Sequence, residues 1–153
     1  MRGRVLLVVG LLIGVIWSYG KARVPVDHQV YTALADAVNN ETGAILRLSE
    51  ITEYDWTQLC IVEAYSGRRD VEELINVQWP YWWVPQLHDG QTRLVFMDGK
   101  QVVGVAESTS ARLRFSRSAP RCYNPISAVF KIEEREFNGT RYRVLAPIIR
   151  DAA

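Results

Sequence analysis

The chain has 153 residues, enough for one domain, and its 48% hydrophobic and 23% charged residues are typical of an ordinary globular protein. Its formal net charge is +1, and residues 1–22 contain Arg2, Arg4 and Lys21 but no acidic residue, so the rest of the chain is slightly acidic. Binding to a phosphate backbone needs clustered Lys and Arg, so this balance argues against a nucleic-acid partner.

Residues 1–22 have the layout of a secretory signal peptide. The basic start MRGR precedes VLLVVGLLIGVIW, a run of uncharged and mostly apolar residues, and the small residues of SYGKA follow. A helix of about 13 residues spans about 20 Å, which is short of the roughly 30 Å hydrocarbon core. The alternative is a retained membrane anchor over residues 5–19, with Trp17 and Tyr19 at the interface. Either alternative exports the remainder, and membrane contact is expected only through this segment.

Residues 27–150 are predicted to form a single globular domain that begins with a helix. Asp27 is its N-cap, and Gly43 supplies the left-handed residue after it. One apolar stripe follows the helical period and consists of Val30, Leu34, Ala37 and Val38. A first strand is expected in AILRL, and WTQLCIVEAY, apolar on both faces, predicts a central strand.

A second helix and two hairpins complete the predicted domain. In SGRRDVEELINV, Asp70 and Glu73 have capping-box spacing, and the buried side is formed by Val71, Leu74 and Ile75. TRLVFMDGKQVVGVAE predicts a hairpin with a type I′ turn at Asp98–Gly99, and ARLRF is expected to continue that sheet.

The second hairpin is predicted in SAVFKIEEREFNGTRYRVLAP, with its turn at Asn138–Gly139. One of its faces is expected to be solvated, because charged residues alternate with apolar ones at Glu133, Arg135, Arg141 and Arg143. The sum is an α+β fold: a mainly antiparallel sheet of five to seven strands with two short helices.

Cys60 and Cys122 are the only cysteines, and we expect them to form a disulfide. An even pair of cysteines in an exported protein is more often oxidised than free. Closing a loop of about 63 residues would stabilise the fold by roughly 4 kcal/mol on the chain-entropy model. The alternative is two unpaired, buried thiols. A metal site is not expected, because two cysteines and two scattered histidines do not make a ligand set.

Three segments occur in the order EYDWTQLCIVEAYSG, RLVFMDGKQVVGVAE and AVFKIEE. With their Trp-Asp-like strand ending near Pro-Tyr and their LVF-x-DG-K-VV hairpin, they resemble a family of small bacterial envelope proteins and lipoproteins. This chain has Ala64 where the family pattern has proline before Tyr65, and it lacks a lipid-attachment cysteine. The resemblance implies an exported globular domain, periplasmic or anchored in the inner membrane, and supplies no catalytic residues.

The densest cluster of aromatic side chains is VQWPYWWVP, which holds Trp79, Tyr81, Trp82 and Trp83. Exposed Trp and Tyr rings are common anchors for protein partners and can stack on sugars. The alternative is that these rings seal the core of a small domain. An extended segment would point neighbouring rings in opposite directions, so one or two buried rings and one exposed ring are expected.

No convincing catalytic set is visible in the sequence. His88 and Asp89 are adjacent, but HDGQ fits a turn better than acid–base chemistry. We therefore expect a non-enzymatic module without a cofactor that binds an envelope protein. A cell-wall glycan bound by exposed tryptophans is the alternative, and a hydrolase using His88 is the least favoured hypothesis.

Overall fold

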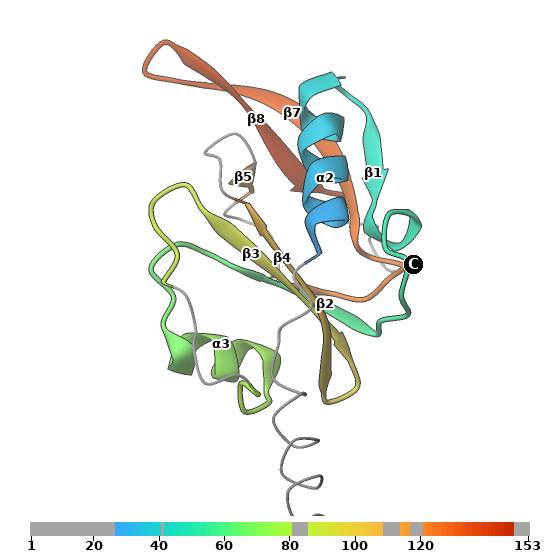
Figure 1. Ribbon diagram of the computed structural model, residues 1–153. Helices are drawn as coiled ribbons and strands as arrows, with labels where there is room; N and C mark the ends of the chain where they lie inside the picture. Colours follow the sequence, from blue (N-terminus) through green and yellow to red (C-terminus); the bar gives the residue numbers. More distant parts are fainter. Residues whose placement is uncertain (1–26, 41, 81–85, 109–113, 117–120, 149–153) are drawn as a thin grey trace, which may run out of the picture.

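The computed structural model describes residues 27–40, 42–80, 86–108, 114–116 and 121–148 (Figure 1). These residues form an α+β fold with two helices, as predicted, but the predicted single sheet of five to seven strands is replaced by eight strands in two four-stranded sheets. The sequence did not predict that division. Neither helix in the described part of the chain combines the length and the apolar character needed to span a bilayer. The proposed signal or anchor segment lies outside the described residues.

The first sheet, called sheet A here, is antiparallel throughout and has the order β4-β3-β2-β6. Its strands are β2 (Gln58–Val62), β3 (Thr92–Asp98), β4 (Gln101–Ser108) and β6 (Cys122–Tyr123). Strand β2 lies between two neighbours and is buried over most of its length, which confirms the predicted central strand.

The turn between β3 and β4 differs from its prediction by one residue. Asp98 pairs with Gln101, so the two-residue loop is Gly99–Lys100. Only Gly99 has a positive φ, +56°, and this is the pattern of a type II′ turn rather than the predicted type I′. The shift arises because Asp98 remains in the ladder.

The second sheet, called sheet B, has the order β1-β7-β8-β5. Its strands are β1 (Ile45–Arg47), β5 (Arg114–Phe115), β7 (Val129–Phe137) and β8 (Thr140–Pro147). The predicted turn at Asn138–Gly139 is confirmed, with φ of +50° and +75°. Strand β5 was expected to continue the first sheet. It instead pairs with β8 in sheet B, and in parallel.

The charged residues of the β7–β8 hairpin lie on both of its faces, so the prediction of one solvated face was wrong. Arg143 pairs across the ladder with Glu134, and Arg141 pairs with Glu136. Side chains alternate between the two faces of a strand, so these four residues lie on one face and Glu133 lies on the other. Arg143 lies on the face turned towards helix α2 (His28–Asn40) and donates from Nη1 to the carbonyl oxygen of Val38 at 2.5 Å.

Helix α2 joins the two sheets. Its predicted N-cap is confirmed, because Asp27 Oδ1 accepts from the backbone N–H groups of Gln29 and Val30, both at 3.0 Å. The Asp27 N–H donates to the carbonyl oxygen of Val105 in β4 at 2.7 Å, while Arg143 of β8 holds the other end. The helix therefore begins against sheet A and ends against sheet B (Figure 1).

The main core lies between the two sheets and under α2. It contains the predicted helix stripe and both sheets' inward residues: Val30, Leu34, Val38, Leu59, Ile61, Leu94, Phe96, Phe130, Ile132 and Leu145, all at most 5% exposed. Each sheet therefore supplies one layer of a sandwich that α2 closes along one side.

A second core lies on the other face of sheet A, beneath helix α3 (Arg68–Ile75). Of the three residues predicted to be buried, Val71 and Ile75 are confirmed at 0% and 3% exposure, and Leu74 is partly buried against the same core. The predicted cap is shifted, because the N-cap is Gly67 and Asp70 is the third helical residue, whose Oδ2 accepts from the Gly67 N–H at 2.7 Å. This face also holds Arg93, fully buried, whose Nε donates to Glu107 Oε1 at 2.7 Å.

Candidate functional site

The aromatic segment VQWPYWWVP begins with a ring that lies in the core, that of Trp79. Trp79 is only 3% exposed and packs in the core beneath α3, so its ring is not available as a stacking surface. Its backbone is held by α3, because Glu72 Oε1 accepts from the Trp79 N–H at 2.9 Å and Arg68 Nη2 donates to the Trp79 carbonyl oxygen at 3.1 Å. For Trp79, the core-sealing alternative is correct.

The remaining candidate rings, Tyr81, Trp82 and Trp83, lie outside the described residues. The segment HDGQ that follows them forms the predicted turn. The Gln91 N–H donates to the His88 carbonyl oxygen at 3.0 Å, and Gly90 has a φ of +76°. His88 is exposed there, and its backbone N–H donates to Gln91 Oε1 at 2.7 Å. Among the described residues, no group of three or more His, Cys, Asp or Glu is placed to hold a metal ion.

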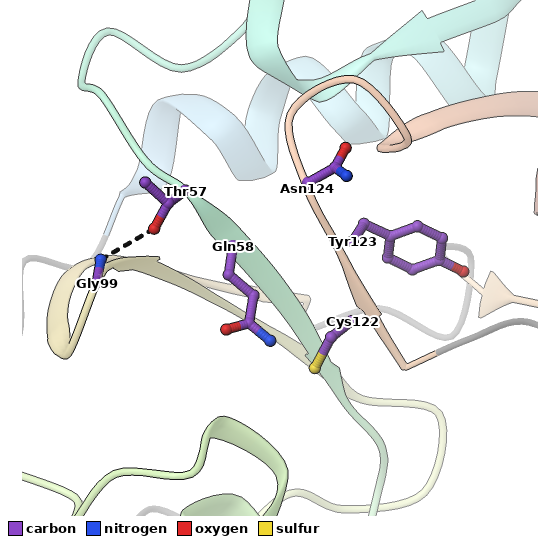
Figure 2. A pocket seen from close by; sticks show the side chains of 6 residues that line it. All are labelled: Thr57, Gln58, Gly99, Cys122, Tyr123 and Asn124. Carbon is purple, nitrogen blue, oxygen red and sulfur yellow. Dashed lines mark hydrogen bonds between the residues drawn. The ribbon is translucent and has the colours of Figure 1, made fainter.

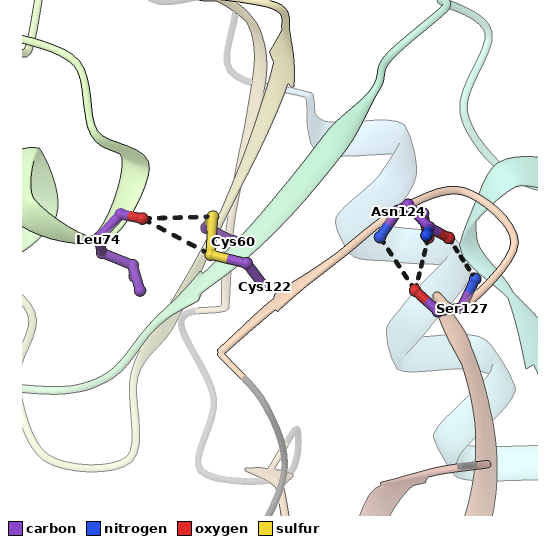
Figure 3. Close-up of a disulfide and its surroundings, with 5 residues drawn as sticks. All are labelled: Cys60, Leu74, Cys122, Asn124 and Ser127. Atoms are coloured by element: carbon purple, nitrogen blue, oxygen red, sulfur yellow. Dashed lines mark hydrogen bonds between the residues drawn. A yellow bond between two sulfur atoms is a disulfide. The ribbon is translucent and has the colours of Figure 1, made fainter. Parts of the chain in front are cut away.

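Cys60 and Cys122 form the expected disulfide, at directly opposite positions of β2 and β6 (Figure 3). The neighbouring Ile61 N–H donates to the Arg121 carbonyl oxygen at 2.7 Å, so the cysteines occupy the close, non-hydrogen-bonded position of the ladder. Their Cα atoms are 4.1 Å apart. The disulfide therefore fastens the short edge strand β6 to the interior strand β2.

A shallow depression of about 440 Å³ lies beside this disulfide (Figure 2). It is lined by the start of β2, the β3–β4 turn and β6, through Thr57, Gln58, Gly99, Cys122, Tyr123 and Asn124. Thr57 Oγ1 accepts from the Gly99 N–H at 2.9 Å and so fixes the turn against β2. The depression gives solvent a route to the Cys122 side of the disulfide.

A larger groove of about 570 Å³ opens where the two sheets meet, and we call it the inter-sheet groove. On the side of sheet A, its wall is formed by the residues that follow β2 and by the loop that leads into the start of β3. On the other side, sheet B supplies β5, β7 and β8. The lining residues are Glu63, Ala64, Tyr65, Asp89, Gly90, Gln91, Thr92, Arg114, Phe115, Ser116, Arg135, Tyr142 and Val144. Its volume is in the range typical of ligand sites.

Tyr65 is the most unusual residue of the inter-sheet groove. Its side chain is 66% exposed, and its φ is +64°, in the left-handed region that bulky residues rarely adopt. The backbone is fixed by its N–H, which donates to the Leu87 carbonyl oxygen at 3.0 Å. The Ser66 N–H donates to the Glu63 carbonyl oxygen at 3.4 Å, so Tyr65 is the third residue of a β-turn, a position where a positive φ is usually filled by glycine or asparagine. Tyrosine is a strained choice there and its ring is not packed in the core, and such strain clusters at functional sites.

The wall formed by sheet B carries a second tyrosine and two arginines. The Arg114 guanidinium carbon lies 5.1 Å from the centre of the Tyr142 ring, which is cation–π geometry. Arg135, the cross-strand partner of Tyr142, donates to Glu133 Oε2 at 3.1 Å. This wall is basic, whereas the sheet A wall presents Glu63 and Asp89.

Sequence reasoning did not find the inter-sheet groove, because its walls come from several separate segments between Glu63 and Val144. The unusual backbone of Tyr65 has no signal in the residue type, since tyrosine is a poor left-handed residue. No protein-family model, curated protein or solved structure matches this chain. The resemblance to bacterial envelope proteins stays a prediction.

Proposed function

We propose that the chain is an exported, non-enzymatic protein-interaction module of the bacterial envelope, and that a partner protein binds in the inter-sheet groove. The observation that carries this proposal is Tyr65, an exposed ring held in the left-handed region at that groove. A strained, exposed aromatic costs folding free energy, so its presence favours a role in binding.

The composition of the inter-sheet groove suits a polypeptide partner. Tyrosine and arginine are enriched at protein interfaces and among their hot spots, and this groove holds Tyr65, Tyr142, Arg114 and Arg135. Its basic and acidic walls would orient a partner segment that carries charges of both signs. Arg114 is already stacked on Tyr142, so less side-chain entropy would be lost on binding.

The proposed location follows from the signal-like N-terminus together with the disulfide. Disulfides persist outside the reducing cytoplasm, so the Cys60–Cys122 bond is compatible with an extracytoplasmic protein. We propose a periplasmic domain that is either released after cleavage or kept at the inner membrane by residues 5–19. A cell-wall glycan is the alternative occupant. Because Trp79 is buried, a glycan would have to stack on Trp82 or Trp83.

The proposal is tested by site-specific photo-crosslinking in cells. A photoreactive phenylalanine analogue at Tyr65 is compared with the same analogue at Ile126, which is 85% exposed but lies in the turn between β6 and β7. We expect position 65 to crosslink one envelope protein that position 126 does not. Identical crosslinking patterns at the two positions, or none at position 65, would contradict the proposal.

The crosslinked protein is then purified and its affinity measured with three variants. Tyr65→Gly and Arg114→Ala should each weaken binding at least about tenfold, as truncated hot spots do, while Ile126→Ala should bind like the parent. Tyr65→Gly should also be as stable as the parent or up to about 1 kcal/mol more stable, because glycine relieves the left-handed strain. Saturable binding of soluble peptidoglycan fragments that Tyr65→Gly abolishes would favour the glycan alternative instead.

A further inference from the structure

The two cysteines of the disulfide differ in their exposure to solvent. Cys60 lies in β2 between β3 and β6 and is 0% exposed. Cys122 lies in the edge strand β6, is only partly buried, and lines the shallow depression together with Gln58 and Thr57 (Figure 2). A solute that enters the depression therefore meets Cys122 and cannot reach Cys60.

We infer that Cys122 is a thiol–disulfide exchange site. The thiolate of a small-molecule thiol or of a dithiol protein attacks Cys122 Sγ and forms a new sulfur–sulfur bond. The Cys60–Cys122 bond breaks, and its electron pair leaves with Cys60 Sγ, which takes a proton from water. A dithiol completes the reaction when its second thiolate attacks the mixed disulfide. Cys122 is then released as a thiol and the dithiol is oxidised to a disulfide.

The surroundings of Cys60 favour the protonated thiol over the thiolate that first leaves. Its neighbours in the core beneath α3 include Val62, Val95 and Ile75, which do not solvate a negative charge. The carbonyl oxygen of Leu74 lies 3.9 Å from Cys60 Sγ and 3.7 Å from Cys122 Sγ, so an acceptor for a thiol hydrogen is already in place (Figure 3). Access therefore determines which sulfur is attacked, and burial of the leaving sulfur makes the step slow.

Strand β6 has backbone and side-chain bonds that do not depend on the disulfide. On one side the Ile61 N–H donates to the Arg121 carbonyl oxygen. On the other side Asn124 and Ser127 close a tight turn: the Asn124 N–H donates to Ser127 Oγ at 3.0 Å, and the Ser127 N–H donates to Asn124 Oδ1 at 2.8 Å (Figure 3). The folded domain can therefore carry an adduct on Cys122.

The test uses the full, oxidised chain incubated with reduced glutathione at pH 8 without denaturant. Samples are quenched with an alkylating agent, and peptide mass spectrometry locates the glutathione. We expect the mixed disulfide on Cys122, formed at a rate that does not change at urea concentrations below the unfolding transition. An adduct mainly on Cys60, or a reaction that follows global unfolding, would overturn the inference.

Two matched variants show whether the depression is the route of attack. Gln58→Trp fills the depression and should slow adduct formation at least tenfold. Lys131→Trp places the same side chain at an exposed position of β7 in sheet B and should leave the rate unchanged. Equal rates in both variants would contradict attack through this depression.

Discussion

Tyr123 carries a buried hydroxyl group at the edge of sheet A. The side chain is 5% exposed, its ring contacts Phe130 edge-on at 5.1 Å between centroids, and the hydroxyl has no hydrogen-bond partner among the described residues. Burial raises its pKa from 10.0 to about 12. The neutral phenol is thus favoured in the folded state, but its hydroxyl is poorly accommodated there.

Tyr123→Phe should keep the ring contact and remove the unpaired hydroxyl, so its free energy of unfolding at pH 7 should equal that of the parent or exceed it by up to about 1 kcal/mol. Because the folded pKa is raised, the contribution of Tyr123 is intact below pH 10 and is lost as the pH rises from 10 towards 12. Urea unfolding at pH 7 and pH 11 should show a smaller alkaline loss in the variant. An equally steep decrease in the free energy of unfolding of the variant would show that Tyr123 does not cause the alkaline loss of stability.

The Tyr123→Phe variant should still lose part of its free energy of unfolding at alkaline pH, because of Tyr54. Burial, and then the nearby carboxylate of Asp27, also raise the pKa of Tyr54. Its ring lies against Gly104 of β4 and contacts Phe96 edge-on at 5.6 Å between centroids. The close approach of ring and backbone explains why position 104 is glycine.

Gly104→Ala should destabilise the fold by about 1–3 kcal/mol, the usual cost of overpacking. A Cβ atom at this position would overlap the hydroxyl oxygen and ring carbons of Tyr54, and the core around Phe96 leaves that ring little room to move. The urea midpoint of Gly104→Ala is compared with that of Gln101→Ala, an exposed position of the same strand that should change by less than about 0.5 kcal/mol. Equal midpoints would show that the Tyr54 ring can be displaced.

At the scale of single residues, the sequence predicted what depends on residue type and missed what depends on distant neighbours. Cys60 and Cys122 could be paired because a chain with two cysteines leaves one combination. Gly104 is visible in the sequence, but Tyr54, the ring that requires it, is 50 positions away. Tyr65 could not be singled out, because a turn position with a positive φ is normally marked by glycine or asparagine rather than tyrosine.

At the scale of elements, α3 and the segment after it form one unit. Glu72 Oε1 accepts from Arg68 Nε and from the Trp79 N–H, both at 2.9 Å. The pKa of Glu72 is lowered, first by the hydrogen bond from Arg68 and then by that from Trp79. The stabilisation of the fold by this carboxylate is therefore present above about pH 4.5 and is lost as the pH falls through its lowered pKa.

Glu72→Gln should loosen the start of the aromatic segment without unfolding α3. A neutral amide oxygen is a weaker acceptor than a carboxylate, so the Trp79 amide hydrogen should exchange several-fold faster. Hydrogen exchange followed by mass spectrometry would measure this, with the exposed neighbour Glu73→Gln as the control. In the parent, protection of Trp79 should also decrease below pH 4.5. Unchanged exchange in Glu72→Gln would mean that Trp79 is held by its buried ring alone.

Element types could be predicted from the sequence more accurately than their ends. The apolar stripe of α2 and the alternation in the strands correctly marked the elements, because periodicity reports which face is buried. The cap of α3 and the β3–β4 turn were each displaced along the chain. By residue type Asp70 can be the N-cap or the third residue of the helix equally well, and Asp98 fits a turn as well as a strand end.

At the scale of the whole molecule, the division into two sheets could not be predicted, because it depends on which distant strands pair. Strand β5 has two residues and joins β8 in parallel, a pairing that leaves no local pattern. The inter-sheet groove was missed for the same reason. In contrast, the central position of β2 could be predicted, since a strand that is apolar on both faces must be covered on both.

Replacing both cysteines tests how far this arrangement depends on its cross-link. The disulfide joins positions 62 residues apart, and on the chain-entropy model its loss lowers the free energy of unfolding by about 4 kcal/mol. Cys60→Ala/Cys122→Ala should therefore show this decrease in urea unfolding, and the reduced parent should show a similar one. The backbone bonds of β6 predict that both still fold at low urea. A loss below about 1 kcal/mol would mean that the unfolded chain is already compact around these strands, so that the cross-link removes little entropy.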